Sequence, residues 1–129
     1  MRYTIVDDIL EWQDCAIYAV GPDEPVYSAL QLMAEKNIGA VLVMEGERLL
    51  GILSERDYTR RVILQDRDAQ RTLVGEIMTS QVVTVEPQCT LQECMKIMTY
   101  GGFRHLPVMI GDEVVGLISI REVARALIP

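Results

Sequence analysis

The feature that most constrains this chain is an internal repeat that runs without a gap. Residues 20–63 align with residues 85–128 at a constant offset of 65. Apolar residues face apolar residues at most aligned strand positions, so the chain contains two copies of one structural unit. Eleven of the 44 aligned pairs are identical: Val20/Val85, Pro22/Pro87, Met33/Met98, Val43/Val108, Met44/Met109, Gly46/Gly111, Gly51/Gly116, Ser54/Ser119, Arg56/Arg121, Arg60/Arg125 and Ile63/Ile128.

Each copy predicts the order strand, helix, strand, strand, helix. The helices are indicated by apolar stripes at helical spacing, and the strands by short apolar runs joined by a glycine turn. Residues 1–16 carry apolar residues at roughly helical spacing and predict a lead-in helix packed on the first copy. The predicted elements are strand 17–20, helix 26–36, strands 38–44 and 49–54 and helix 55–64, then strand 82–85, helix 91–100, strands 104–110 and 114–119 and helix 120–127.

The repeat also predicts how the elements are assembled. A single copy of about 45 residues is too small to cover the apolar face of its own sheet. We therefore predict an α+β fold in which two β-α-β-β-α repeats pack sheet to sheet about a pseudo-twofold axis. The lead-in helix and repeat 1 are assigned to residues 1–64, a solvated charged linker to 65–72, and repeat 2 to 73–129, where residues 73–80 form a short turn of helix leading into the second copy.

Composition and charge restrict the partners and the compartment. A net charge of -7 and a pI near 4.6 argue against nucleic acid as a partner, because backbone binding needs clustered Lys and Arg. No apolar run approaches the ~20 residues that a membrane-spanning helix needs, and acids stand where a signal peptide would be basic. We predict a cytoplasmic protein with no membrane contact. Cys15, Cys89 and Cys94 are predicted to be reduced core or boundary thiols, and a reactive sensor thiol is the alternative.

The residues offer little for catalysis. The chain has one histidine and shows no Ser-His-acid set, no Gly-rich phosphate loop and no cysteine spacing typical of zinc. We predict that the protein is not an enzyme, holds no metal and requires no cofactor.

Several motifs agree in order with one known family. They are the duplicated pattern, GILSERD at residues 51–57, EIMT at 76–79 and FRHLPVM at 103–109. Together they resemble a tandem pair of CBS (cystathionine-β-synthase) domains, a Bateman module of the stand-alone bacterial or archaeal type, over residues 6–128. The resemblance implies a regulatory module that binds an adenine nucleotide (AMP, ADP or ATP), or else S-adenosylmethionine or NAD(H). It also implies a homodimer and an unknown regulated partner protein.

Residues for such a ligand can be named. A nucleoside phosphate needs a carboxylate for the ribose hydroxyls, cations and amide donors for the phosphate, and an apolar slot for the purine. Asp57 follows Ser54 by three residues in the first turn of a helix, so we assign Asp57 to the ribose and Ser54 to the phosphate side. The resemblance adds the basic residues for the phosphate and the residues flanking the adenine. The predicted site is Ile52, Leu53, Ser54, Asp57, Val83 through its backbone, Arg104, His105 and Arg121.

The symmetry-related site has lost part of this set. Ser119 remains, but Glu122 replaces the aspartate, and Gly39–Ala40 stand where the other site has its basic pair. We predict one strong site per chain and a weaker second site formed by Tyr18, Arg56, Ser119 and Glu122. An alternative is that Asp57 and Ser54 only cap a helix and that the chain is a structural dimerisation module with vestigial clefts.

Overall fold

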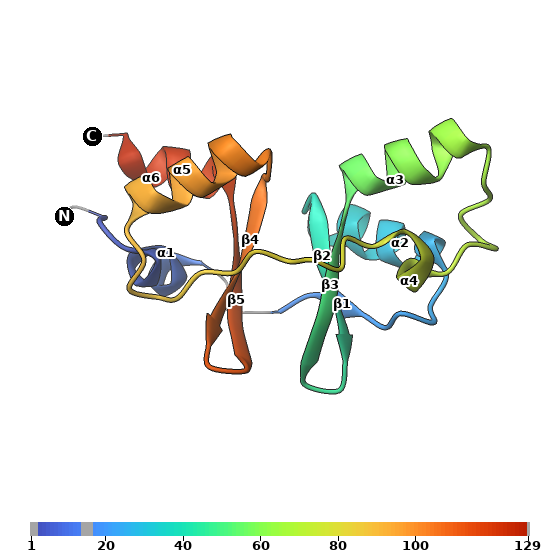
Figure 1. Ribbon diagram of the computed structural model, residues 1–129, viewed down its shortest axis with the longest axis horizontal. Helices are drawn as coiled ribbons and strands as arrows, with labels where there is room; N and C mark the ends of the chain where they lie inside the picture. Colours follow the sequence, from blue (N-terminus) through green and yellow to red (C-terminus); the bar gives the residue numbers. More distant parts are fainter. Residues whose placement is uncertain (1–2, 14–16, 129) are drawn as a thin grey trace. The chain divides into compact units, whose positions relative to one another are not determined.

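The computed structural model describes residues 3–13 and 17–128, and the chain divides into two compact units. Tyr18–Val82 form the first-repeat unit, and Met1–Ile17 with Val83–Pro129 form the second-repeat unit. Each unit combines helices with one sheet (Figure 1), so the predicted α+β class is confirmed. Within the first-repeat unit the elements are β1 (Ala19–Val20), α2 (Val26–Lys36), β2 (Ala40–Glu45), β3 (Arg48–Ser54), α3 (Glu55–Arg61), a 3-10 helix (Ile63–Gln65) and α4 (Val74–Ile77).

The sheet of the first-repeat unit has the order β1-β2-β3. β1 runs parallel to β2, and β2 and β3 form an antiparallel hairpin. Gly46 lies in the hairpin turn with a φ of 61°, a conformation that glycine adopts without steric cost. The core beside this sheet contains residues of α2, β2, β3 and α4, among them Val26, Met33, Val43, Leu53, Val74 and Ile77.

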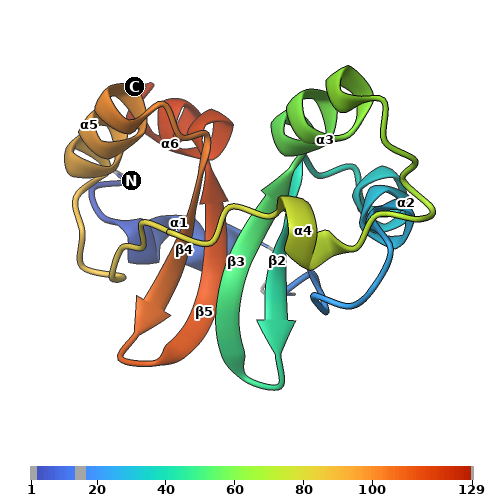
Figure 2. The same cartoon turned by 45° about the vertical axis from the view of Figure 1, so that its right-hand side comes forward.

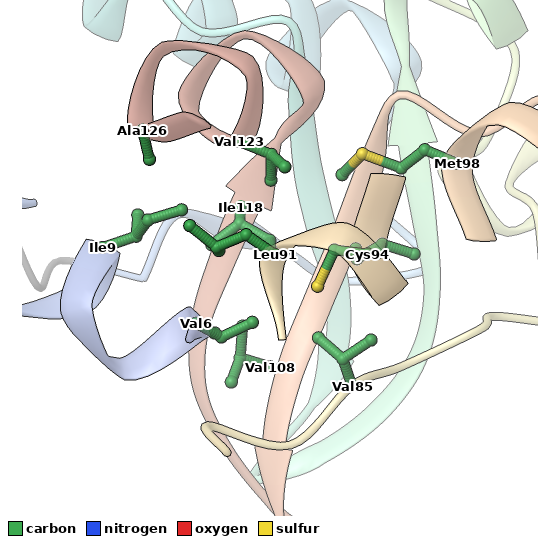
Figure 3. Packing of buried hydrophobic residues seen from close by; sticks show 11 residues of the cluster. Val6, Ile9, Val85, Leu91, Cys94, Met98, Val108, Ile118, Val123 and Ala126 are labelled. Carbon is green, nitrogen blue, oxygen red and sulfur yellow. The ribbon is translucent and has the colours of Figure 1, made fainter. Parts of the chain in front are cut away.

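The second-repeat unit repeats this arrangement around β4 and β5. Its elements are α1 (Val6–Trp12), α5 (Leu91–Gly101), β4 (His105–Ile110), β5 (Glu113–Ser119) and α6 (Ile120–Leu127). Figure 3 shows its buried core, in which Val6 and Ile9 of α1 pack with residues of α5, β4, β5 and α6. Helices α2 and α6 have the predicted bounds.

The predicted strand at residues 82–85 is reduced to a single parallel bridge between Val85 and Val108. In the first-repeat unit the Leu42 N–H donates to the Tyr18 carbonyl over 3.0 Å. The residue that matches Leu42 is Pro107, which has no N–H and cannot make the equivalent bond to Val83. The prediction of a full strand is therefore wrong, because one proline removes a ladder hydrogen bond.

The lead-in helix packs on the second repeat, and the prediction that it packs on the first repeat is wrong. Its Val6 and Ile9 are wholly buried in the core of the second-repeat unit. Conversely, α4 at residues 74–77, predicted to lead into the second copy, packs in the core of the first-repeat unit. Figure 2 shows α1 beside β4 and β5, and α4 beside β2 and β3. Residues 1–2 and 14–16 of the predicted lead-in segment lie outside the described residues.

These two exchanged segments are themselves a repeat, at an offset of 68. The sequence TIVDDI at residues 4–9 matches TLVGEI at 72–77. The Val6 N–H donates to the Cys89 carbonyl over 2.9 Å, as the Val74 N–H donates to the Glu24 carbonyl over 2.8 Å. Leu91 N–H donates to the Thr4 carbonyl over 3.0 Å, as Val26 N–H donates to the Thr72 carbonyl over 2.8 Å. Each repeat is thus completed by the segment that precedes the other repeat in sequence.

The predicted linker at residues 65–72 is largely exposed, as expected, but it is not free of the fold. Thr72 is buried, and its hydroxyl donates to the Asp68 carbonyl over 2.8 Å. The Tyr27 N–H donates to the Ala69 carbonyl over 3.0 Å. The end of this segment therefore packs on the first turn of α2 and fixes the start of α4.

No helix within residues 3–13 and 17–128 is long and apolar enough to cross a membrane.

Candidate functional site

The Ser54–Asp57 corner lies where β3 ends and α3 begins. Ser54 is the N-cap of α3, and its hydroxyl oxygen accepts from the Asp57 N–H over 3.2 Å. In return, Oδ2 of Asp57 accepts from the Ser54 N–H over 2.9 Å and from its hydroxyl over 3.0 Å. This reciprocal capping box satisfies amide groups that the first turn of a helix leaves unpaired. It also holds the buried carboxylate of Asp57 in one orientation.

The segment after α4 runs along β3 at this corner. Ile52 and Thr79 form an antiparallel bridge, with N–H to carbonyl distances of 2.9 and 3.0 Å. Gly51 permits the approach, because a Cβ there would lie 2.6 Å from the Thr79 carbonyl oxygen and 2.8 Å from Sδ of Met78. A guanidinium nitrogen of Arg61 donates to the Ile77 and Met78 carbonyls over 2.9 and 3.1 Å. Segment 77–79 is thus pinned against the Ser-x-x-Asp element.

Thr79 is the site residue that sequence reasoning missed. Its hydroxyl donates to Oδ1 of Asp57 over 3.2 Å, so Thr79 directly contacts the residue that is predicted to bind the ribose. Thr79 is the last residue of the EIMT motif, one of the motifs that carry the family resemblance. The match between residues 4–9 and 72–77 predicts that both segments pack in equivalent ways, but Thr79 lies two residues beyond that match, so only the tertiary structure places its hydroxyl.

Of the residues predicted to bracket an adenine, Ile52 and Leu53 differ in exposure. Leu53 is wholly buried in the core of the first-repeat unit, so its side chain is not available as a wall of a purine slot. Ile52 is partly exposed, because successive strand residues point to opposite faces of the sheet. Of the pair, only Ile52 offers a side chain to a ligand at this corner.

The equivalent corner of the second-repeat unit is built in the same way. Ser119 is the N-cap of α6, and its hydroxyl oxygen accepts from the Glu122 N–H over 3.1 Å. Oε1 of Glu122 accepts from the Ser119 N–H over 2.9 Å. Oε2 accepts from the side-chain amide of Gln13 over 2.5 Å, and the same amide donates to the Leu117 carbonyl over 3.0 Å. Gln13 is a second residue that the sequence analysis did not identify.

The basic pair lies beside this second corner, within the same unit. His105 faces Ser119 directly in the register of β4 and β5, and the Ile120 N–H donates to the Arg104 carbonyl over 2.8 Å. Burial lowers the pKa of His105 below its usual value, while the negative charge of Glu122 raises it and the positive charge of Arg104 lowers it further. A neutral imidazole is therefore favoured, which donates one hydrogen bond and accepts another.

The residues predicted for the principal site are divided between the two units. Ile52, Leu53, Ser54 and Asp57 belong to the first-repeat unit, and Val83, Arg104, His105 and Arg121 to the second-repeat unit. Their combination in one site stays a prediction. For the weaker site, Tyr18 and Arg56 lie in the first-repeat unit, and Ser119 and Glu122 in the second-repeat unit.

Comparison with known sequences gives the family. The sequence profile described as CBS domain matches residues 6–64 and 74–129. A CBS domain-containing protein of Bacillus subtilis, YhcV, is 32% identical over 108 residues, which are 84% of this chain and 76% of that protein. The mitochondrial CBS domain-containing protein CBSX3 of Arabidopsis thaliana is 39% identical over 111 residues. That match covers 82% of this chain and only 54% of the Arabidopsis protein, so this chain spans about half of its length.

Solved structures agree with the sequence comparison. A protein with CBS domains from Burkholderia ambifaria MC40-6 superposes with a TM-score of 0.93 at 45% identity, and the match covers 98% of this chain and 94% of that one. CBS domain pairs are in general regulatory modules, and the relatives are named as CBS domain-containing proteins rather than as enzymes. The two repeats, their shared hydrogen bonds and these matches show that the chain belongs to the CBS domain family, as a tandem CBS pair.

Proposed function

We propose that this CBS pair binds an adenine nucleotide of the AMP, ADP or ATP class, does not turn it over, and regulates a partner protein through the bound state. The observation that carries the proposal is the carboxylate of Asp57, which is buried and held in one orientation by Ser54. Among the described residues, the donors that reach this carboxylate are uncharged: the Ser54 N–H and the hydroxyls of Ser54 and Thr79.

The hydrogen-bonding capacity of Asp57 suits a ribose. Each carboxylate oxygen can accept about two hydrogen bonds. Oδ2 accepts two from Ser54, whereas Oδ1 accepts one from Thr79 at the long distance of 3.2 Å. A cis-diol that donates to Oδ1 can use the remaining acceptor position and replace the weak Thr79 contact. Arg104, Arg121 and His105, which the family resemblance assigns to the phosphate, complete the proposed site.

The test is isothermal titration with AMP, ADP and ATP, and with 2′,3′-dideoxyadenosine as a control ligand without the diol. Asp57→Asn keeps the shape of the side chain but removes its charge. Because hydrogen bonds to charged groups contribute about 1.5–3 kcal/mol, the substitution should weaken AMP binding about tenfold or more. Glu55→Gln is the matched control, since Glu55 is an exposed acid in the same helical turn. Absence of heat with every adenosine-bearing ligand would refute the proposal.

A structural role is the second candidate, and exposed apolar side chains favour it. In the second-repeat unit the side chains of Tyr100 and Ile128 are 86% and 71% exposed, and Leu64 of the first-repeat unit is 70% exposed. We propose that such residues support a homodimer. A purely structural dimer would show the same melting temperature with and without nucleotide, whereas a ligand that binds only the native state raises it. Light scattering with and without AMP measures the dimer itself.

A further inference from the structure

Gln13 holds the position in the second-repeat unit that Thr79 holds in the first. The exchanged segments at residues 4–9 and 72–77 make matching hydrogen bonds to their repeats. Beyond them the paths differ, because α4 ends at Ile77 whereas α1 continues to Trp12. In the first-repeat unit, Thr79 reaches the Ile52 carbonyl with its backbone N–H and the acid with its hydroxyl. In the second-repeat unit, the side-chain amide of Gln13 donates to both equivalent groups, the Leu117 carbonyl and the carboxylate of Glu122.

The chemistry of the two contacts is unequal. A primary amide carries two N–H donors, and both are used by Gln13: one on the Leu117 carbonyl at 3.0 Å and one on Oε2 of Glu122 at 2.5 Å. The hydroxyl of Thr79 lies 3.2 Å from Asp57. Glu122 and Asp57 are both carboxylate acceptors, and the Gln13 amide approaches its acceptor more closely than the Thr79 hydroxyl does, so Gln13 makes the stronger contact. One of the two amide donors reaches the acid, so the Gln13 amide takes at Oε2 of Glu122 the place that one hydroxyl of a ribose diol would take.

The packing of α1 holds Gln13 beside Leu117 and Glu122. Val6 and Ile9 anchor α1 in the core, and the Gln13 N–H closes the helix on the Ile9 carbonyl over 3.1 Å. α1 lies close against β5, because a Cβ at Gly116 would be 2.6 Å from Cδ2 of Leu10. The amide is therefore oriented by packing before any ligand arrives.

We propose that Gln13 determines that only one of the two repeats accepts a ribose, by donating to Oε2 of Glu122 in place of one hydroxyl of the diol. This inference rests on the proposed function and adds the reason for one strong site per chain. Replacement of Gln13 by a residue without donors opens the acid of the second repeat to an adenosine ligand.

The experiment is isothermal titration with adenosine, which has the diol but no phosphate and so does not depend on the basic residues. Gln13→Met keeps the side-chain length and removes both donors, and Gln13→Ala is a second variant that also removes the bulk. Gln92→Met is the matched control, because Gln92 is exposed on α5. Circular dichroism checks that each variant is folded.

Wild-type protein should bind one equivalent per chain, and Gln13→Met should bind a second. Loss of the competing charge-assisted bond should tighten binding at the second repeat about tenfold or more. In the Asp57→Ala background, Gln13→Met should keep one equivalent, and adding Glu122→Gln should abolish it. The added binding should be absent with 2′,3′-dideoxyadenosine.

The other outcomes separate the two proposals. One equivalent in both wild type and Gln13→Met overturns the role of Gln13 and leaves the proposed function intact. Two equivalents in wild type overturn it as well, since the second repeat would then bind with Gln13 present. No binding of adenosine to any of these proteins overturns this inference. The proposed function is overturned only if AMP, ADP and ATP also fail to bind.

Discussion

The hydroxyl of Thr79 donates to Oδ1 of Asp57 across 22 positions of sequence, over a distance of 3.2 Å. The contact joins the segment after α4 to the Ser-x-x-Asp element of the first repeat. It exists because the backbone of Thr79 pairs with Ile52 and so brings the hydroxyl next to the carboxylate. Asp57, the residue predicted to bind the ribose, is therefore positioned by two parts of the chain, the capping box of α3 and segment 77–79.

Thr79→Val should lower stability, because it removes this donor while keeping the shape of the side chain. A net hydrogen bond contributes about 1 kcal/mol, which corresponds to a fall in Tm of a few degrees. Thermal denaturation measures the change. Thr99→Val is the control, since Thr99 is exposed on α5 and should change stability by less than about 0.5 kcal/mol. Equal Tm values for wild type and Thr79→Val would contradict the importance of the contact.

Gly51→Ala should displace segment 77–79 from β3. The added Cβ would lie 2.6 Å from the Thr79 carbonyl oxygen, so backbone must move. Overpacking of this kind costs about 1–3 kcal/mol. Hydrogen exchange should be faster at the Thr79 amide, whose bond to Ile52 is broken, and urea unfolding measures the loss of stability. Gly21→Ala is the matched control, because its nearest atom would be at 3.6 Å, an ordinary contact.

His105 should titrate below the usual pKa of histidine. Burial is the largest cause and Arg104 adds to it, while Glu122 opposes it. Because the unfolded chain then binds more protons than the native state, the contribution of His105 to stability is complete above the unfolded pKa. It is lost as the pH falls through that value toward the lowered pKa. His105 is the single histidine of the chain, so its imidazole proton resonance gives the pKa directly by NMR.

Two variants check the causes of this shift. Glu122→Gln removes the charge that raises the pKa and should lower the pKa of His105 further. Arg104→Gln removes the charge that lowers it and should raise it. A pKa at or above the ordinary value in wild type would contradict the dominance of burial. If AMP phosphate contacts His105 as proposed, saturating AMP should raise the pKa.

Cys94 should resist alkylation in the native protein. It is wholly buried, and burial together with the hydrogen bond to Cys89 raises the pKa of the Cys94 thiol to about 12. The Cys94 thiol donates to Sγ of Cys89 over 3.6 Å, and both cysteines are free. Since the thiolate is the reactive form, iodoacetamide at mildly alkaline pH should modify the more exposed Cys89 first, as measured by peptide mass spectrometry.

Denaturant should abolish the difference between the two thiols. Equal rates of modification of Cys89 and Cys94 in the native protein would contradict the burial of Cys94. The third predicted thiol, Cys15, lies outside the residues that the structure describes.

Local sequence determined the duplication, the bounds of several elements and the capping box at each of the two corners. The offset of 65 predicted the duplication, and the apolar stripes predicted the bounds of α2 and α6. Ser54 and Asp57 are three residues apart, so their capping box follows from the geometry of a first helical turn. The same reasoning applies to Ser119 and Glu122. These features depend on residues close in sequence, for which spacing alone is informative.

Only the tertiary structure decided which repeat each flanking segment completes. α1 packs with repeat 2 and α4 with repeat 1, although each precedes the other repeat in sequence. The physical reason is that burial is not directional along the chain: an apolar stripe fixes which face of a helix is buried, but not the core that buries it. The contacts of Thr79 with Asp57 and of Gln13 with Glu122 follow from that choice and join residues 22 and 109 positions apart.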